Sequence, residues 1–285
     1  MASEKTKVIE WLFFNRKYDA GAGVLIDPVV TMDDVEEGIT KTGARLKKSN
    51  PANFWKDLTR SGATGLNRNW PRRVFEQGFA GGDAIGQSDR AVFMFVDVQA
   101  GQDEPFLDKF PFDDDLSVSK LQSLSMPQAM KALGRPGENW HAQVADRLNV
   151  VSSFFALCSP RNVPPRSVQE VNFLQTGIKM KDGETDAAFS VLADDGQWLV
   201  SAEVKGRTEQ FHLPQIARAA HALATTAAKS STLADVVGVI PLGIKVVGRS
   251  MLWVVEFEPV VSPDTPLARV AEGVFELVPH VPGIE

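Results

Sequence analysis

Cysteine is nearly absent from this chain, and long apolar runs are absent altogether. The single cysteine, Cys158, has no partner for an internal disulfide, and one thiolate cannot build a structural zinc site. No segment approaches the roughly 18 apolar residues that a membrane span requires. The first residues, MASEKTKVIEW, also lack the basic and apolar regions of a secretory signal. We therefore expect a protein of the reducing cytoplasm that has no membrane partner.

Three common enzyme signatures are missing as well. The histidines form no HExxH pattern, and no serine lies in a GxSxG elbow. The glycines of residues 78–86 are not followed by the Lys-Ser or Lys-Thr pair of a phosphate-binding P-loop. Zinc hydrolysis, acyl-enzyme chemistry and P-loop chemistry therefore have little support in this sequence.

Charge is unevenly distributed along the chain. The net charge is −6, yet residues 41–75 contain nine Lys or Arg residues and one acid, so that this segment carries +8 and the rest −14. A concentrated basic segment in an acidic protein indicates a polyanionic partner, and we expect double-stranded DNA. Arginine and asparagine side chains can bond to phosphates and base edges. We expect such contacts from Arg60, Asn67, Arg68, Asn69, Arg72 and Arg73. The alternative is a solvated basic surface whose tryptophans pack in the core.

The first half of the chain is predicted to be mainly helical. With 285 residues, the protein is expected to form one domain with a lobe, or two domains. The apolar spacing predicts helices over residues 3–18, 117–133 and 138–157, and the Thr31–Asp34 capping box opens another that extends to about residue 48. An apolar run predicts a strand at 91–98, and the acidic, turn-rich residues 101–116 indicate a surface loop or an internal boundary. We expect a helical N-terminal region over 1–160.

The second half, 161–285, is predicted to form a mixed sheet with flanking helices, an α+β arrangement. A short helix is expected at 168–176, followed by strands at 185–192 and 197–206 around the hairpin turn at 194–196. Pro214 then opens an alanine-rich helix to about residue 229, and two or three further strands follow.

The most informative pattern is Asp186 followed, after sixteen residues, by Glu203-Val204-Lys205. Glu203 and Lys205 are two apart in a strand, so their side chains leave the same face about 7 Å apart. Antiparallel pairing of the hairpin can bring Asp186 beside Glu203. Two carboxylates and the backbone carbonyl of Val204 offer the hard oxygen ligands that Mg²⁺ prefers. Lys205 would then contact the attacking water and the scissile phosphate.

Two further polar residues flank this pattern. Glu170, expected on the short helix before the hairpin, could add an outer carboxylate, and its alternative is a solvated helix position. Gln215, at the start of the following helix, could bond to a phosphate or to a metal-bound water, or could serve as a simple cap. Three basic residues close to the pattern are candidate phosphate contacts: Lys179, Lys181 and Arg207.

Glu170, the run GETD ending in Asp186, the run EVKG and Gln215 together resemble the PD-(D/E)XK nuclease superfamily. The resemblance covers about residues 168–257, and Thr185 stands where the family name has proline. It implies an αβββαβ core whose motif residues bind magnesium and hydrolyse DNA phosphodiester bonds. The extra N-terminal region is most similar to a type II restriction endonuclease, which implies a sequence-specific homodimer that leaves 5′-phosphate ends.

Other interpretations of the same residues remain open. A repair, recombination or transposition nuclease of this fold would recognise DNA structure instead of sequence. A non-catalytic DNA-binding protein would bind in a salt-dependent manner without cleavage. In the simplest case, Glu203 and Lys205 form an ion pair on a solvated sheet face, with Asp186 as a polar residue at the hairpin edge.

Overall fold

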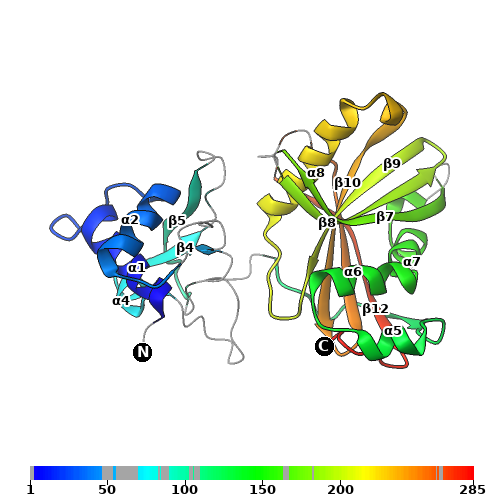
Figure 1. Cartoon of the computed structure of the whole chain (residues 1–285), viewed down its shortest axis with the longest axis horizontal. Helices are drawn as coiled ribbons and strands as arrows, with labels where there is room; N and C mark the ends of the chain where they lie inside the picture. The colour runs from blue at the N-terminus through cyan, green and yellow to red at the C-terminus, as the bar shows by residue number, and fades with distance from the viewer. Residues whose placement is uncertain are drawn as a thin grey trace. The chain divides into compact units, whose positions relative to one another are not determined.

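The protein consists of two compact units (Figure 1). The computed structural model describes residues 3–46, 54–55, 70–82, 84, 90–102, 105, 110–162, 167–181, 183–260, 262 and 266–285. The N-terminal unit comprises Met1–Lys109 with Thr208–Gln210, and the C-terminal unit comprises Phe110–Arg207 with Phe211–Glu285. The boundary therefore lies within the acidic segment 101–116 and not at residue 160.

The N-terminal unit mixes helices with strands, whereas a mainly helical region was expected. Its sheet has the order β3-β5-β4, and β1 and β2 form a separate small hairpin. The elements in chain order are α1 (Glu4–Leu12), a π-helical turn (Phe13–Lys17), β1 (Tyr18–Asp19), β2 (Val24–Leu25), β3 (Val29–Thr31), α2 (Met32–Thr42), α4 (Arg72–Glu76), β4 (Phe79–Gly82) and β5 (Ala91–Asp97). Aromatic residues dominate the core. The buried ring of Phe13, for example, contacts Tyr18, Phe79 and Phe95.

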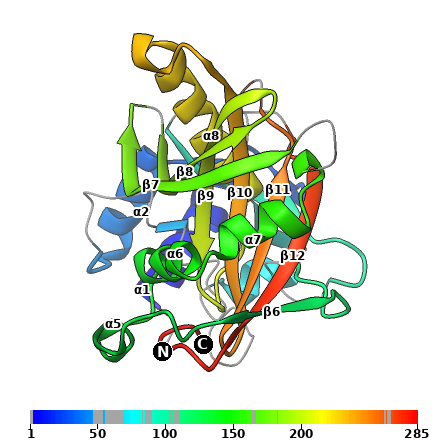
Figure 2. The ribbon, with the colours of Figure 1, turned by 90° about the vertical axis from the view of Figure 1, so that its right-hand side faces the viewer.

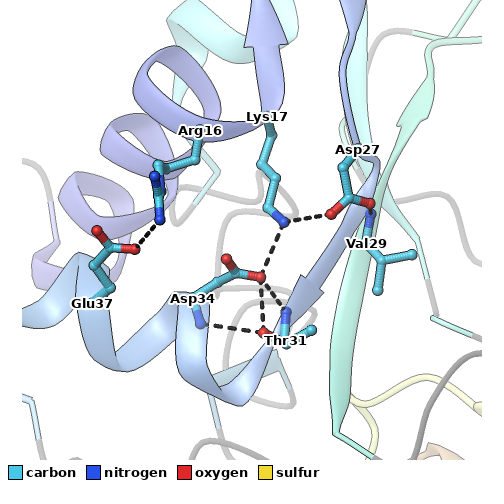
Figure 3. A network of polar contacts seen from close by, with 7 residues as sticks. All are labelled: Arg16, Lys17, Asp27, Val29, Thr31, Asp34 and Glu37. Carbon is cyan, nitrogen blue, oxygen red and sulfur yellow. Dashed lines mark hydrogen bonds and ion pairs between the residues drawn. The ribbon is translucent and has the colours of Figure 1, made fainter.

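A buried lysine connects the π-helical turn to the start of α2 (Figure 3). The ammonium of Lys17 lies 2.8 Å from Asp27 Oδ2 and 3.0 Å from Asp34 Oδ2. Asp34 also completes the predicted capping box, because its carboxylate accepts the Thr31 N–H at 2.8 Å while its own N–H donates to the Thr31 hydroxyl. Burial opposes ionisation of Asp34, but the hydrogen bonds from Thr31 and Lys17 outweigh it and lower the pKa of this carboxyl.

The C-terminal unit is built on a seven-stranded mixed sheet with the order β6-β12-β11-β10-β9-β8-β7. β7, β8 and β9 form an antiparallel meander, β9 pairs parallel with β10, and β12 pairs parallel with β6. The strands are β6 (Val118–Gln122), β7 (Val168–Met180), β8 (Gly183–Ala193), β9 (Gly196–Lys205), β10 (Val236–Gly248), β11 (Met251–Phe257) and β12 (Arg269–Val278). The expected α+β class with a mixed sheet is therefore confirmed.

Helices cover both faces of this sheet (Figure 2). The short helix α5 (Gln128–Leu133) precedes α6 (Glu138–Arg147) and α7 (Val150–Leu157). α6 and α7 pack on one face, where Val151 and Phe154 join Val200 and Val204 in the main core. α8 (Leu213–Ala228) covers the other face through Ala220 and Leu223. The apolar stripe of residues 138–157 thus packs against the sheet of the C-terminal unit. This packing explains why the boundary between the two units does not fall at residue 160. No described helix combines the length and the apolar character needed to cross a bilayer.

Three predicted helices in this unit were wrong or incomplete. Residues 168–176 lie in β7, because pairing with β8 along almost its whole length outweighs the helix-compatible local pattern. The segment 117–133 begins with strand β6 and forms helix only in α5. The helix expected at 138–157 is interrupted at Asn149, which adopts the left-handed conformation with φ 56°. The hairpin at 194–196 and the helix opened by Pro214 are confirmed.

Replacing Lys17 with methionine should destabilise the N-terminal unit by about 3 kcal/mol, because Asp34 would lose the cation that compensates its burial. Hydrogen exchange of peptides from α1 and α2 would measure the change. Arg72→Met is the matched control, since Arg72 pairs with Glu76 while its side chain is 90% exposed. The control should cost less than about 1 kcal/mol. Equal exchange in both variants would contradict the structural role of Lys17.

Candidate active site

The predicted motif residues meet at one end of the β8–β9 hairpin. The register pairs Ala187 with Ala202, which places Asp186 next to Glu203 on the neighbouring strand. The carboxylate Oδ2 of Asp186 accepts the backbone N–H of Val204 at 2.8 Å. This bond fixes the aspartate against the third strand of the meander, as the pairing argument from the sequence required.

The ammonium of Lys205 stands at the centre of this site. Its nitrogen contacts Glu203 Oε1 most closely and lies 3.1 Å from Glu138 Oε1 and 3.5 Å from Asp186 Oδ2. It also donates to the carbonyl of Val204 at 3.2 Å. Burial by itself would lower the pKa of Lys205, but the three carboxylates outweigh it and raise that pKa above its ordinary value.

Burial separates this arrangement from an ordinary surface ion pair. The side chains of Lys205 and Glu203 are 2% and 1% exposed. The interpretation of these residues as a solvated pair on an open sheet face is therefore wrong. Taking several charges out of water is costly and adds little to stability compared with apolar packing, so such clusters are concentrated at functional sites.

Thr185 occupies the place where the family name has proline. Its buried hydroxyl lies 2.9 Å from the carbonyl oxygen of Ala187 and 3.1 Å from the hydroxyl of Ser201. The contact with Ser201 and a further bond from the Thr185 hydroxyl to the Ala202 carbonyl at 3.2 Å hold β8 against β9 immediately before Asp186. Thr185 therefore fixes the position of Asp186 by hydrogen bonding.

The sequence did not identify Glu138 as a site residue. It is the first residue of α6, and its carboxylate reaches Lys205 across 67 positions of sequence. An acidic residue in the first turn of a helix is explained by the helix dipole alone. Only the packing of α6 against the sheet brings it to the motif, so no local signal could have revealed its role.

Glu170 does not belong to this site. It is exposed on β7 and pairs with Leu192, which lies six residues beyond Asp186 along β8. Six strand residues span about 20 Å, so Glu170 lies too far from Asp186 to add a carboxylate to this site. The additional carboxylate near Lys205 is that of Glu138. The error follows from the helix predicted at 168–176. Gln215 lies half-buried in the first turn of α8, where its backbone N–H donates to the carbonyl of His212 at 2.8 Å. The catalytic role of Gln215 stays a prediction.

The predicted DNA-contacting residues fall into three groups. Arg60, Asn67, Arg68 and Asn69 lie outside the described residues. Arg72 and Arg73 are exposed on α4, where they pair with Glu76 and Glu10. Lys179 is exposed near the end of β7, Lys181 is exposed just after that strand, and Arg207 is exposed two residues beyond the end of β9.

The two tryptophans of the basic segment contribute to the core. Trp70 is buried, and its indole N–H donates to the carbonyl of Phe79 at 3.2 Å. Trp55 stacks on Phe93 with ring centroids 5.2 Å apart. This part of the alternative interpretation is confirmed, so these rings are not available to stack on bases.

The donor chemistry of the site suits a hard cation. Asp186, Glu203 and the Val204 carbonyl offer oxygen atoms only, with Glu138 as a further carboxylate. Within the described residues, no group of three or more acidic, histidine or cysteine side chains is already spaced to coordinate a metal. The oxygens surround the Lys205 nitrogen at hydrogen-bond distances, whereas Mg²⁺ requires about 2.1 Å.

Comparisons of the chain with protein-family models, with curated proteins and with solved structures returned no match.

Lys205 and Glu203 should depend strongly on each other for stability. Lys205→Met and Glu203→Gln should each destabilise the protein, since each leaves a buried partner uncompensated. The double variant should lose less than the sum of the two, with a coupling free energy of about 1–3 kcal/mol. Urea denaturation of the four proteins in a double-mutant cycle measures this coupling. Additive losses would contradict a direct buried pair.

Proposed function

We propose that the protein is a magnesium-dependent endodeoxyribonuclease of the PD-(D/E)XK type, acting in the cytoplasm on double-stranded DNA as a sequence-specific type II restriction enzyme. The observation that carries the proposal is the convergence of Asp186, Glu203 and Lys205 at the end of two adjacent strands, in a buried cluster. Structural ion pairs rarely gather three carboxylates around one buried lysine.

The order of the elements supports the same proposal. The helices α6 and α7 are followed by the meander β7–β8–β9, then by α8, and then by β10 parallel to β9. This order agrees with the αβββαβ core that the resemblance implies. Asp186 lies on the second strand of the meander and the Glu-x-Lys run ends the third, so the motif residues occupy adjacent strands.

Each site residue has a distinct role in this proposal. Asp186, Glu203 and the carbonyl of Val204 would hold the metal, and Glu138 would orient a water or a second ion from α6. Bound magnesium would stabilise charge on the phosphate and make a bound water more acidic. Lys205 would donate to a phosphate oxygen and keep the scissile group aligned, because its ammonium brings a positive charge and several N–H donors to the site.

DNA binding would use basic residues in both units. Lys179, Lys181 and Arg207 are exposed near the site and would contact phosphates on either side of the scissile bond. The basic segment 41–75 of the N-terminal unit would add contacts from its Arg and Asn side chains. If the recognised sequence is a palindrome, a homodimer with one site per subunit would cut one DNA strand with each subunit and leave 5′-phosphate ends.

Glu203→Ala should abolish cleavage and leave DNA binding largely intact, because it removes a metal ligand without changing the basic surface. Asp186→Ala and Lys205→Ala should behave in the same way. Purified protein would be incubated with unmethylated phage DNA and plasmid, with and without millimolar magnesium, and the products separated on a gel. Glu170→Ala is the matched control and should cut normally, since this acid is exposed on β7 away from the site.

The pattern of products separates the candidate functions. Discrete magnesium-dependent bands from the wild type alone would support a site-specific enzyme. Intact duplex together with cleavage of flaps or mismatches would favour a structure-specific nuclease. Salt-sensitive binding with no cleavage of any DNA would favour a non-catalytic binding protein. Cleavage retained by Glu203→Ala would overturn the assignment of the site.

Glu138→Ala should reduce the cleavage rate by roughly tenfold to a hundredfold, the loss typical of a residue that supports the metal ligands. The expected loss is smaller than for Glu203 because Glu138 is one-third exposed and contacts the site through Lys205. Initial rates on a defined plasmid measure the effect. Glu184→Ala serves as the control, since this acid is exposed on β8 and lies opposite Lys179 in the strand register. Equal rates for the two variants would remove Glu138 from the site.

A further inference from the structure

The Lys205 ammonium is bonded to the oxygen atoms that would hold a metal. Carboxylates from α6, β8 and β9 and one backbone carbonyl lie within 3.5 Å of this single nitrogen. Three of these donors, from Asp186, Glu203 and Val204, are the ones assigned to the metal in the proposed function. The ammonium therefore stands where these oxygen atoms converge.

The charges explain why a cation belongs at this point. Three carboxylates lie within 3.5 Å of the Lys205 ammonium, and the buried Lys245 is the neighbour of Lys205 on β10. Glu203 is almost completely buried, so its charge has little access to water and needs a cation close by. A divalent ion at the position of the Lys205 ammonium would place two positive charges among these carboxylates in place of one.

A magnesium ion and the ammonium cannot share this position. Magnesium would need to approach the oxygens to about 2.1 Å and would complete its shell with waters. At the centre of the present cluster, that volume is filled by the ammonium group of Lys205. Two cations held by the same oxygens would also repel each other strongly in a site with so little solvent.

We propose that Lys205 occupies the metal position and must leave it before a divalent ion can bind. The lysine thereby sets the metal concentration at which the site becomes loaded. Displacement also moves the ammonium away from the carboxylates, where it is free to bond to a substrate phosphate. This inference rests on the proposed function only in naming magnesium as the ion.

Metal affinity without DNA provides the test. Binding of Mn²⁺, used in place of Mg²⁺, would be followed by electron paramagnetic resonance for the wild type and for Lys205→Met. The variant should bind the ion roughly tenfold more tightly or better, because the competing ammonium is gone. Unchanged or weaker binding by a folded Lys205→Met protein would overturn the proposal.

A neighbouring lysine supplies the matched control. Lys245 is 7% exposed on β10 and lies directly beside Lys205 in the parallel register. Lys245→Met removes a buried positive charge one strand away from the same site. If it tightened Mn²⁺ binding as much as Lys205→Met, a general loss of positive field would explain the gain, and the proposal would fail.

A measurement on the wild type keeps the test valid if Lys205→Met does not fold. The ammonium of Lys205 would be followed by its ¹⁵N–¹H resonance, assigned by its loss in Lys205→Arg, during titration with Mg²⁺. Displacement should shift the resonance or remove it by faster exchange with water. A resonance that stays unchanged while the metal binds would overturn the proposal.

These outcomes are distinguishable from a failure of the proposed function. The metal measurements contain no DNA, so they do not depend on cleavage. A protein that binds Mn²⁺ as expected but cuts no DNA would contradict the nuclease assignment and leave the displacement intact. A wild type and a Lys205→Met variant that both fail to bind a divalent ion would overturn the displacement.

Discussion

The compensation of three carboxylates by one buried ammonium is the interaction on which the site depends. Glu138, Asp186 and Glu203 come from a helix and two strands, and Lys205 is the group that all three contact. Without that cation, the acids would repel one another where water gives little screening. The position of α6 at the end of β9 and the pairing of β8 with β9 are therefore linked through a single side chain.

The N-terminal unit contains a comparable lysine that differs in one respect. Lys17 is also buried, and among the described residues it forms ion pairs with Asp27 and Asp34, of which Asp27 remains half exposed. Asp34 also forms both hydrogen bonds of the capping box, in which its carboxylate accepts the Thr31 N–H and its own N–H donates to the Thr31 hydroxyl. Both carboxylates of the Lys17 cluster also accept backbone N–H groups, Asp34 from Thr31 and Asp27 from Val29. In the proposed function, the carboxylates around Lys205 would hold a divalent ion.

Short-range features of the fold could be predicted from the sequence, and features set by long-range packing could not. The capping box of Thr31 and the two-residue hairpin after Ala193 depend on neighbours in sequence, and both are present. The grouping of Asp186, Glu203 and Lys205 follows from that hairpin, so it was also predictable. Glu138 reaches the site through packing of a helix on the sheet, and β7 is a strand because it pairs with β8. Neither fact is encoded in a local pattern. The acidic residues 101–116 did indicate an internal boundary, but the packing that joins 117–160 to the C-terminal unit was not visible in the sequence.

The irregularity of β7 limits the ways in which two copies of this chain can associate. β7 forms one edge of the large sheet, with a row of backbone groups that another strand could join. Its pairing shifts register twice, between Val168 and Glu170 and between Phe173 and Gln175, and Gly177 adopts φ 62°. A strand bent in this manner offers no straight ladder for a second copy. Continuation of the sheet across β7 is therefore disfavoured, and a dimer of this protein would have to form at the opposite edge strand β6 or on another surface.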